Sequence, residues 1–315
     1  MSSTNKFSAS RLVEIQPAGP EFARAGPRTC FHHPNLISSG GILFPWRAPW
    51  KKSKSVRSLH PPNMPTENTG NTLQVNGIEL YYETHGTGEP LLLLHGGSGC
   101  HEDWVYAGRD EFLREHTLIT PDARGHGRSS NPSKSITHRQ CALDTLALLD
   151  HLAIKKCKAI GISMGGNILL HMATLQPHRI TAMVVVSATM YFPEQARAIM
   201  RQVPVDTQPP QAWETMRKRH KLGDEQIKAI WEWSRGMAES YDDMNFTPPT
   251  LSKITASTLI VYGDRDFLYP IEMAVDMFRA IPRSALWVVP NGGHGPVFLE
   301  AAPHFAKTVL TFLRQ

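Results

Sequence analysis

With 315 residues, 41% of them hydrophobic and 19% charged, the chain has the composition of a globular protein and not of a disordered one. The formal net charge of +5 is concentrated in residues 1–70, which contain nine lysines and arginines against three acids. The remainder is close to neutral, so no nucleic-acid partner is expected.

Residues 1–70 form a basic, proline-rich leader in which no helical or strand periodicity is sustained. They contain nine of the 24 prolines, a composition that predicts disorder. Three interpretations remain open: an organelle transit peptide, a flexible tail, or a segment upstream of the true start, with Met64 as the natural first residue. The many prolines argue against the amphipathic helix of a transit peptide. We favour the third interpretation. A secretory signal is not expected, since the N-terminus lacks the apolar stretch it requires.

Membrane, metal and disulfide features are not indicated by the sequence. No apolar run approaches the roughly 20 residues that span a bilayer. The cysteines lack C-x-x-C spacing, which argues against a zinc site or a disulfide framework. They are Cys30, Cys100, Cys141 and Cys157. We therefore expect a cytoplasmic protein with reduced thiols, a monomer or homodimer that acts on a small-molecule substrate.

The predicted elements alternate between strands and helices from about residue 72 onward. Asn76-Gly77 joins two strand-like runs, and Asn-Gly is the strongest two-residue hairpin signal. Further strands are predicted at 91–94, 117–120, 158–162, 180–187, 258–262 and 286–289. Helices are predicted at 103–115, 137–152, 167–176, 271–281 and 301–313. This alternation indicates an α/β fold, a mostly parallel sheet with helices on both faces.

Residues 190–250 interrupt the alternation, because they hold helical segments at 193–202, 211–220 and 224–241 with no strand signal. We expect a small helical cap insertion over the carboxyl edge of the sheet, within a single domain at 71–315. Aromatic residues of the insertion either line a substrate pocket or only attach the insertion to the sheet. The candidate pocket residues are Ser98, Trp231, Trp233, Tyr241 and Phe246.

A serine motif stands between the strand at 158–162 and the helix that follows it. Gly161-Ile162-Ser163-Met164-Gly165 has the pattern G-x-S-x-G. Small residues flank the serine because a sharp strand-to-helix turn leaves no room for Cβ atoms. Such a turn exposes the serine Oγ and places the next backbone N–H beside it, at a helix N-terminus.

A serine hydroxyl is a weak nucleophile and needs a base, and the base needs a third group to orient it. In open α/β sheets such groups lie on loops after strands. Residues 262–266 follow one predicted strand and supply Asp264 and Asp266, and residues 291–295 follow the last strand and supply His294. The order nucleophile, acid, base is the one typical of G-x-S-x-G enzymes.

From about residue 72 to its end, the chain resembles the α/β-hydrolase family. The matching motifs are His95-Gly96-Gly97, Asp122-x-Arg-Gly-x-Gly-x-Ser129, Gly-x-Ser163-x-Gly-Gly, Gly263-x-x-Asp266 and Gly293-His294. The resemblance implies that Ser163 is the nucleophile, His294 the general base and Asp266 the orienting acid, with Asp264 as its rival. The alternative acid position of some relatives falls at 187–189, which carries no carboxylate.

The resemblance also implies an oxyanion hole made by the backbone N–H groups of Met164 and Gly97, with Ser98 as the alternative to Gly97. Other polar residues of the motifs are interpreted as structural. His95 is expected to brace its loop, as are Asp122, Arg124 and His126.

The implied function is that of a serine hydrolase acting on a small to medium carboxylic ester or lactone through an acyl-enzyme, without a metal or organic cofactor. A serine at the central position of the G-x-S-x-G motif argues against dehalogenase and epoxide-hydrolase chemistry, which uses a carboxylate nucleophile in this family. Two alternatives use the same residues: a C–C bond hydrolase of a ring-cleavage product, and a cofactor-free perhydrolase. A non-enzymatic alternative is a catalytically silent ligand-binding protein on the same fold.

Overall fold

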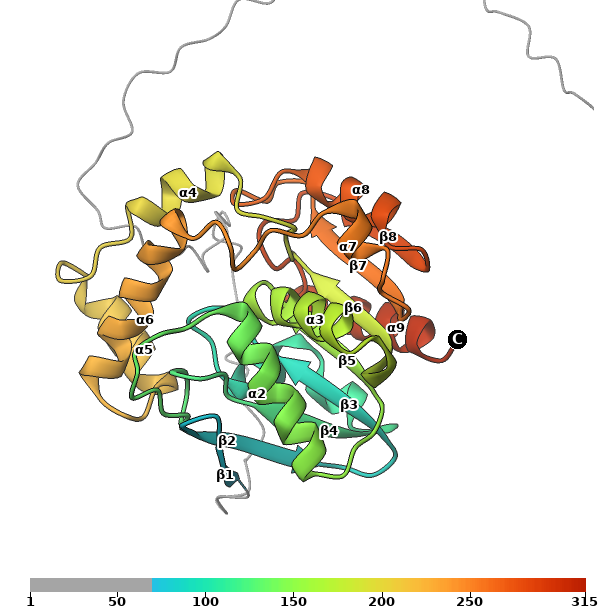
Figure 1. Cartoon of the computed structure of the whole chain (residues 1–315), viewed down its shortest axis with the longest axis horizontal. Coiled ribbons are helices and arrows are strands. Elements are labelled where there is room, and N and C mark those ends of the chain that lie inside the picture. The colour runs from blue at the N-terminus through green and yellow to red at the C-terminus, as the bar shows by residue number, and fades with distance from the viewer. Residues whose placement is uncertain (1–69) are drawn as a thin grey trace, which may run out of the picture. The chain divides into compact units, whose positions relative to one another are not determined.

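The computed structural model describes residues 70–315, which form one eight-stranded sheet with helices on both faces (Figure 1). The strand order is β1-β2-β4-β3-β5-β6-β7-β8. The strands are β1 Asn71–Val75, β2 Ile78–His85, β3 Glu89–Leu94, β4 His116–Pro121, β5 Cys157–Ile162, β6 Ile180–Val186, β7 Ser257–Gly263 and β8 Ser284–Val289. β2 pairs antiparallel with both β1 and β4. Every neighbouring pair from β4 to β8 in the strand order is parallel. The predicted fold class is confirmed, whereas the predicted leader, except Gly70, lies outside the described residues.

The helices that cover the sheet differ from prediction in one place. They are η1 His101–Ala107, α1 Arg109–Phe112, α2 His138–His151, α3 Met164–Leu175, η2 Pro177–Arg179, α8 Ile271–Ala280, η4 Leu299–Ala301 and α9 Ala302–Leu313. The single helix predicted at 103–115 is wrong, because Gly108 interrupts it. Its φ is +91°, and a Cβ there would lie 2.8 Å from the Cβ of Ala306. The close packing of α9 therefore requires glycine, and glycine breaks the helix.

The core consists of two layers, one on each face of the sheet. In β3, Leu92 and Leu94 belong to one layer, and Leu91 and Leu93 belong to the other. This alternation follows from the period of two in a strand, and burial on both faces explains the fully apolar run. α2, α3 and α8 cover the first layer, while η1, α1 and α9 cover the second.

Between β6 and β7 the chain forms the insertion, which we define as residues 190–250. Its helices are α4 Glu194–Arg201, α5 Pro210–Arg219, α6 Asp224–Gly236, η3 Met237–Glu239 and α7 Pro248–Leu251. Figure 1 shows α4, α5 and α6 grouped at one side of the sheet. The insertion has a small apolar cluster of its own, formed by Val203, Val205, Ala212, Met216, Ile227, Ile230 and Trp231.

No helix between residues 70 and 315 is both long enough and apolar enough to cross a membrane.

Candidate active site

Ser163 lies at the junction of β5 and α3, in a backbone conformation that few non-glycine residues adopt. Its φ is +52° and its ψ is −112°, a strained combination that persists only where the surroundings enforce it. Its N–H donates to the Val186 carbonyl at 2.7 Å, and its carbonyl accepts from the Asn167 N–H at 2.9 Å. Ser163 is therefore held by β6 on one side and by the first turn of α3 on the other.

The glycines around Ser163 are required by close packing. A Cβ on Gly161 would lie 2.3 Å from the Gly165 carbonyl oxygen, and a Cβ on Gly165 would lie 2.1 Å from that of Leu94. A Cβ on Gly166 would lie 2.9 Å from the Cβ of Ala188. The beginning of α3 thus sits directly on β3 and β5, which leaves no space for side chains there.

Three polar side chains meet at this turn between β5 and α3. His294 Nε2 lies 2.9 Å from Ser163 Oγ, and His294 Nδ1 lies 2.8 Å from Asp266 Oδ2. Because the carboxylate only accepts, Nδ1 carries the proton, and Nε2 accepts from the serine hydroxyl. The Asp266 side chain is fully buried, while the imidazole remains partly exposed. The arrangement can take a proton from Ser163 and hold the resulting imidazolium against a carboxylate.

Asp266 is fixed by the loop that carries it. Its Oδ1 accepts from the N–H groups of Leu268 at 2.9 Å and Tyr269 at 3.1 Å, which leaves Oδ2 directed at His294. Asp264 is exposed. The structure therefore brings Asp266, and not Asp264, to the histidine.

The loops that carry the acid and the histidine touch each other. A Cβ on Gly263 would lie 2.1 Å from the Gly292 carbonyl oxygen, and that oxygen accepts from the Arg265 N–H at 2.8 Å. The Gly295 N–H donates to Ser187 Oγ at 3.0 Å. Glycine at these positions allows the approach that sets the separation of Asp266 and His294.

The 95–99 loop borders Ser163 at Gly96, where an added Cβ would lie 3.8 Å from the serine Cβ. The Gly99 N–H donates to the Gly96 carbonyl at 3.1 Å and closes a tight turn. Ser98 occupies that turn with a φ of +59°. Met164 follows the serine as the first residue of α3. The two predicted oxyanion donors, Gly97 and Met164, thus lie on segments that flank Ser163.

His95 braces this loop through both ring nitrogens. Its Nε2 lies 3.0 Å from the Ala123 N–H, which only donates, so Nδ1 carries the proton and donates to the Gly96 carbonyl at 2.8 Å. Burial lowers the pKa of His95, which keeps the ring neutral. The contacts are those of a structural residue.

The remaining polar motif residues bond to the scaffold. Arg124 donates to Asp144 at 2.6 and 2.8 Å in a buried pair. The His126 ring is fully buried, with Nδ1 facing the Arg124 carbonyl at 3.1 Å and Nε2 without a hydrogen-bond partner. Burial lowers the pKa of His126 well below its usual value.

Cys100, His101 and Asp122 lie close enough together to be considered as metal ligands. However, His101 Nδ1 faces Asp122 at 2.9 Å and Nε2 faces Glu83 at 3.3 Å. Burial disfavours the charged ring, but these two carboxylates outweigh it and raise the pKa of His101 to about 9. An imidazolium has no lone pair for a metal, so the group is a buried ion network.

The five residues predicted to line a pocket separate in the structure. Trp233 lies 3.5 Å from the Cβ position of Gly97, which places it beside the site with Ser98. Trp231 packs inside the insertion, with its ring 4.6 Å from that of Trp213. Residues two apart on a helix do not share a face, which explains why only one tryptophan of this pair reaches the site.

Phe246 and Tyr241 also lie elsewhere. Phe246 is buried with its ring 4.8 Å from that of His171. Tyr241 is 60% exposed, beneath the guanidinium of Arg197. A pocket role for Trp231, Phe246 and Tyr241 finds no support in these contacts.

Two residues of the insertion that bond to the rest of the domain were missed by sequence reasoning. His220 Nδ1 accepts from the Gly127 N–H at 2.9 Å. Asp243 Oδ2 accepts from the backbone N–H of His138 at 2.8 Å and from its Nδ1 at 2.7 Å. No local pattern reveals either residue, because each partner lies at least 93 positions away in the sequence.

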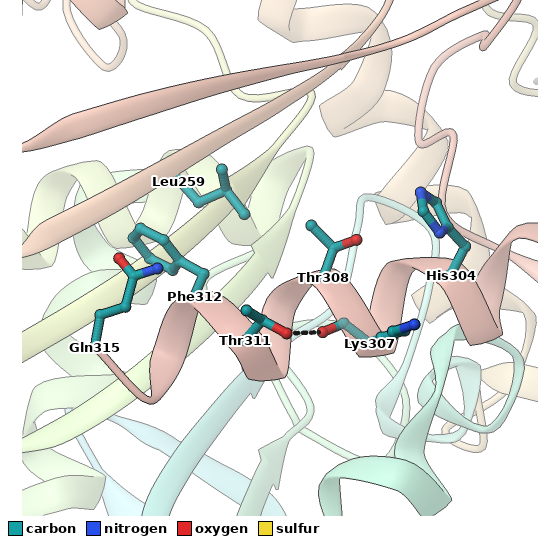
Figure 2. A pocket seen from close by; sticks show the side chains of 7 residues that line it. All are labelled: Leu259, His304, Lys307, Thr308, Thr311, Phe312 and Gln315. Atoms are coloured by element: carbon teal, nitrogen blue, oxygen red, sulfur yellow. Dashed lines mark hydrogen bonds between the residues drawn. The ribbon is translucent and has the colours of Figure 1, made fainter.

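A cavity of about 370 Å³ lies away from these residues, against α9 (Figure 2). It is lined by Leu259, His304, Lys307, Thr308, Thr311, Phe312 and Gln315. Leu259 stands near the beginning of β7, whereas Asp266 follows the end of that strand. None of Ser163, Asp266 and His294 lines this cavity.

Comparison with known proteins identifies the family to which this fold belongs. The model of the alpha/beta hydrolase family matches residues 91–306, more than half of the chain, and the chain belongs to that family.

Individual relatives are similar at lower levels of identity. Mouse serine hydrolase BPHL is 28% identical over 255 residues, covering 78% of this chain and 87% of its own. The 2-hydroxymuconate semialdehyde hydrolase of Pseudomonas sp. strain CF600 is 26% identical over 284 residues, covering 81% and 96%. A thermophilic esterase from Thermogutta terrifontis, solved with malate bound, has a TM-score of 0.62 at 26% identity and covers 77% and 96%. The chain is accordingly a hydrolase.

Proposed function

We propose that the protein is a serine hydrolase that cleaves a small to medium carboxylic ester or lactone through an acyl-enzyme. The observation that carries this proposal is the continuous hydrogen-bonded series from Ser163 through His294 to Asp266. The likeness to a serine hydrolase and to an esterase supports the same reaction.

In the first step, Ser163 Oγ attacks the carbonyl carbon of the substrate while His294 Nε2 takes the hydroxyl proton. Asp266 stabilises the imidazolium through Nδ1. The backbone N–H groups of Gly97 and Met164 hold the developing oxyanion, and fixed donors of this kind contribute about 10²–10³ each to the rate. Collapse of the tetrahedral intermediate expels the alcohol, which receives the proton from His294.

In the second step, water takes the place of the alcohol. His294 accepts a proton from the water as the water oxygen attacks the acyl carbon, and the same donors hold the second oxyanion. Return of that proton to Ser163 Oγ releases the acid and restores the enzyme. Trp233 forms an apolar wall beside Gly97, which suits an uncharged acyl or alcohol group.

C–C bond hydrolysis is the second candidate, and the likeness to a 2-hydroxymuconate semialdehyde hydrolase favours it. Both reactions need the same triad and the same oxyanion donors. Comparing the turnover of chromogenic short-chain esters with that of a ring-cleavage dienoate separates them.

We further propose that residues 71–315 act as one hydrolase domain and that the insertion caps its site. The leader, the cytoplasmic location and the choice between monomer and homodimer stay predictions.

Hydrolysis of a series of p-nitrophenyl esters, from the acetate to the octanoate, tests the triad. Ser163→Ala and His294→Ala should lower kcat by about 10⁴ or more, and Asp266→Asn by about 10⁴, because the histidine then loses its correct tautomer. Asp264→Asn is the matched control, and its kcat should stay within about threefold of the wild type because that carboxylate is exposed.

Covalent labelling of Ser163 by a fluorophosphonate tests whether the protein is catalytically silent. Unlabelled wild-type protein, or equal effects of Asp266→Asn and Asp264→Asn, would contradict the proposed mechanism. Labelled protein that cleaves none of these esters would move the proposal to C–C or lactone substrates.

A further inference from the structure

His220, the residue that follows α5 in the insertion, lies between two loops of the hydrolase core. It is only 2% exposed. The Gly127 N–H lies 2.9 Å from its Nδ1, and a backbone N–H only donates. Nδ1 therefore accepts, and the neutral ring carries its proton on Nε2. Nε2 lies 3.3 Å from the Ser98 carbonyl oxygen and donates to it.

The residues on either side of His220 bond to the same part of the core. Arg219 Nε donates to Asp103 Oδ1 at 3.0 Å. The Lys221 N–H donates to the Gly127 carbonyl at 2.9 Å. The segment 219–221 thus contacts the loop that contains Ser98, the helix η1 that follows it and the 122–129 loop.

The Ser98 carbonyl is a sensitive point for such a contact. Ser98 has a positive φ of +59°, and the turn around it is closed by the bond from the Gly99 N–H to the Gly96 carbonyl. Gly97 precedes Ser98 in this turn. The Ser98 carbonyl shares a peptide group with the Gly99 N–H, and the Gly97 N–H shares one with the Gly96 carbonyl, so the bond that closes the turn links the two groups. An oxyanion donor is effective only when its direction is set before the reaction. A hydrogen bond that fixes the Ser98 carbonyl therefore also helps to fix the direction of the Gly97 N–H.

We propose that His220 is a positioning residue that holds the 95–99 loop in the geometry required for oxyanion binding, so that the seated insertion and the oxyanion hole form together. The inference rests on the proposed function, because that function assigns the Gly97 N–H to the oxyanion. It gives the insertion a role in the chemical step in addition to covering the site.

The charge state of His220 agrees with this role. Burial is the main reason that the pKa of His220 falls to about 4, and His95 and Arg219 lower it further, against the hydrogen bond to Ser98 and the charge of Asp122. The His126 ring, 5.8 Å away, also faces it. The ring is neutral at ordinary pH, so Nδ1 stays an acceptor and Nε2 a donor.

Two substitutions separate the two bonds of the imidazole. His220→Asn keeps an acceptor near the Nδ1 position and removes the donor to Ser98. His220→Gln places an amide donor near the Nε2 position and removes the acceptor for Gly127. We expect His220→Asn to lower kcat for the best ester about tenfold with KM within about twofold. His220→Gln should keep kcat within about threefold of the wild type.

The matched control is His171→Asn. His171 is another buried histidine that joins the core to the insertion, through Nε2 and the Asp243 carbonyl at 2.8 Å. It should lower the melting temperature as much as His220→Asn does while leaving kcat within about twofold. A fall in kcat that follows melting temperature in all three variants would overturn the positioning role.

Hydrogen exchange of the full-length protein gives a readout that does not depend on activity. Backbone amides of residues 95–103 should exchange about tenfold faster in His220→Asn than in the wild type. In His171→Asn their exchange rates should equal those of the wild type. If the wild type neither reacts with the fluorophosphonate nor cleaves an ester, the proposed function fails, and this exchange difference alone decides whether His220 holds the loop. Equal exchange in the wild type and His220→Asn would overturn the inference, whatever the activity.

Discussion

The backbone of Ser163 shows how single residues determine whether the proposed nucleophile is available. A positive φ at a non-glycine residue costs about 1–3 kcal/mol, and it persists because the surrounding contacts enforce it. Those contacts depend on Gly161 and Gly165, whose missing Cβ atoms let α3 begin against β3 and β5. The glycines of the motif are therefore a packing requirement, in addition to the catalytic role that we propose for Ser163.

Gly165→Ala should destabilise the fold by about 3 kcal/mol or more, because the added Cβ would lie 2.1 Å from a backbone oxygen that cannot move alone. Gly236→Ala is the control: it is exposed at the end of α6, with nothing within 4 Å of its Cβ position. That substitution should raise stability by up to about 1 kcal/mol. Urea unfolding measures both changes, and similar values for the two would contradict the packing argument.

Motif residues were predictable from the sequence because their chemistry requires particular neighbours in the chain. Ser163 lies within G-x-S-x-G, and Asp266 and His294 lie on short loops after strands. The sequence did not show which of Trp231 and Trp233 lies beside the site. Which of them reaches the site depends on the rotation of α6 against the core, and no pattern within the helix specifies that.

At the scale of elements, the insertion is attached to the rest of the domain through the start of α2. The backbone N–H groups of His138 and Arg139 donate to the Asp243 carboxylate at 2.8 and 3.1 Å. These are among the unpaired donors at a helix N-terminus, where a negative charge is favourable. One carboxylate of the insertion thus caps a helix of the core.

Asp243→Asn should lower the free energy of unfolding by about 1–2 kcal/mol, because an amide lacks the charge that the helix N-terminus and His138 Nδ1 favour. Asp242→Asn is the matched control, since Asp242 is the exposed neighbour and the substitution removes the same charge. Thermal unfolding of the two variants provides the comparison. A loss of stability in Asp242→Asn as large as in Asp243→Asn would show that net charge, and not this contact, is responsible.

Across the whole molecule, the buried Glu83–His101–Asp122 network joins β2, η1 and the loop after β4. The pKa of His101 is about 9 in the folded protein, above the roughly 6.5 of an unfolded histidine. Its stabilising contribution is therefore complete below about pH 6.5 and is lost as the pH rises through 9.

The free energy of unfolding should accordingly fall by up to about 3 kcal/mol more in the wild type than in His101→Gln between pH 6.5 and 9.5. Other titrating groups are common to both proteins, so the difference isolates His101. Urea unfolding across this range provides the measurement. Parallel pH curves for the two proteins would contradict the assignment of a charged His101.

The fold class was predictable at this scale because alternating strand and helix periods record burial on two faces of a sheet. How the insertion sits was not predictable. His220 and Gly127 are 93 residues apart, and Asp243 and His138 are 105 apart. Contacts between residues so distant leave no trace in the local spacing of apolar residues.

The insertion leaves the sheet after β6, and near its two ends Tyr191 and Asn245 form an isolated antiparallel β-bridge. A segment whose ends lie so close together can be exchanged between relatives without altering the order of the strands. Chimeric enzymes with new selectivity are therefore accessible from this scaffold by transplanting one contiguous piece of the gene. The graft must, however, bring its own counterparts of residues 219–221, because the donor's helices would otherwise arrive without the contacts that fit them to the recipient's loops.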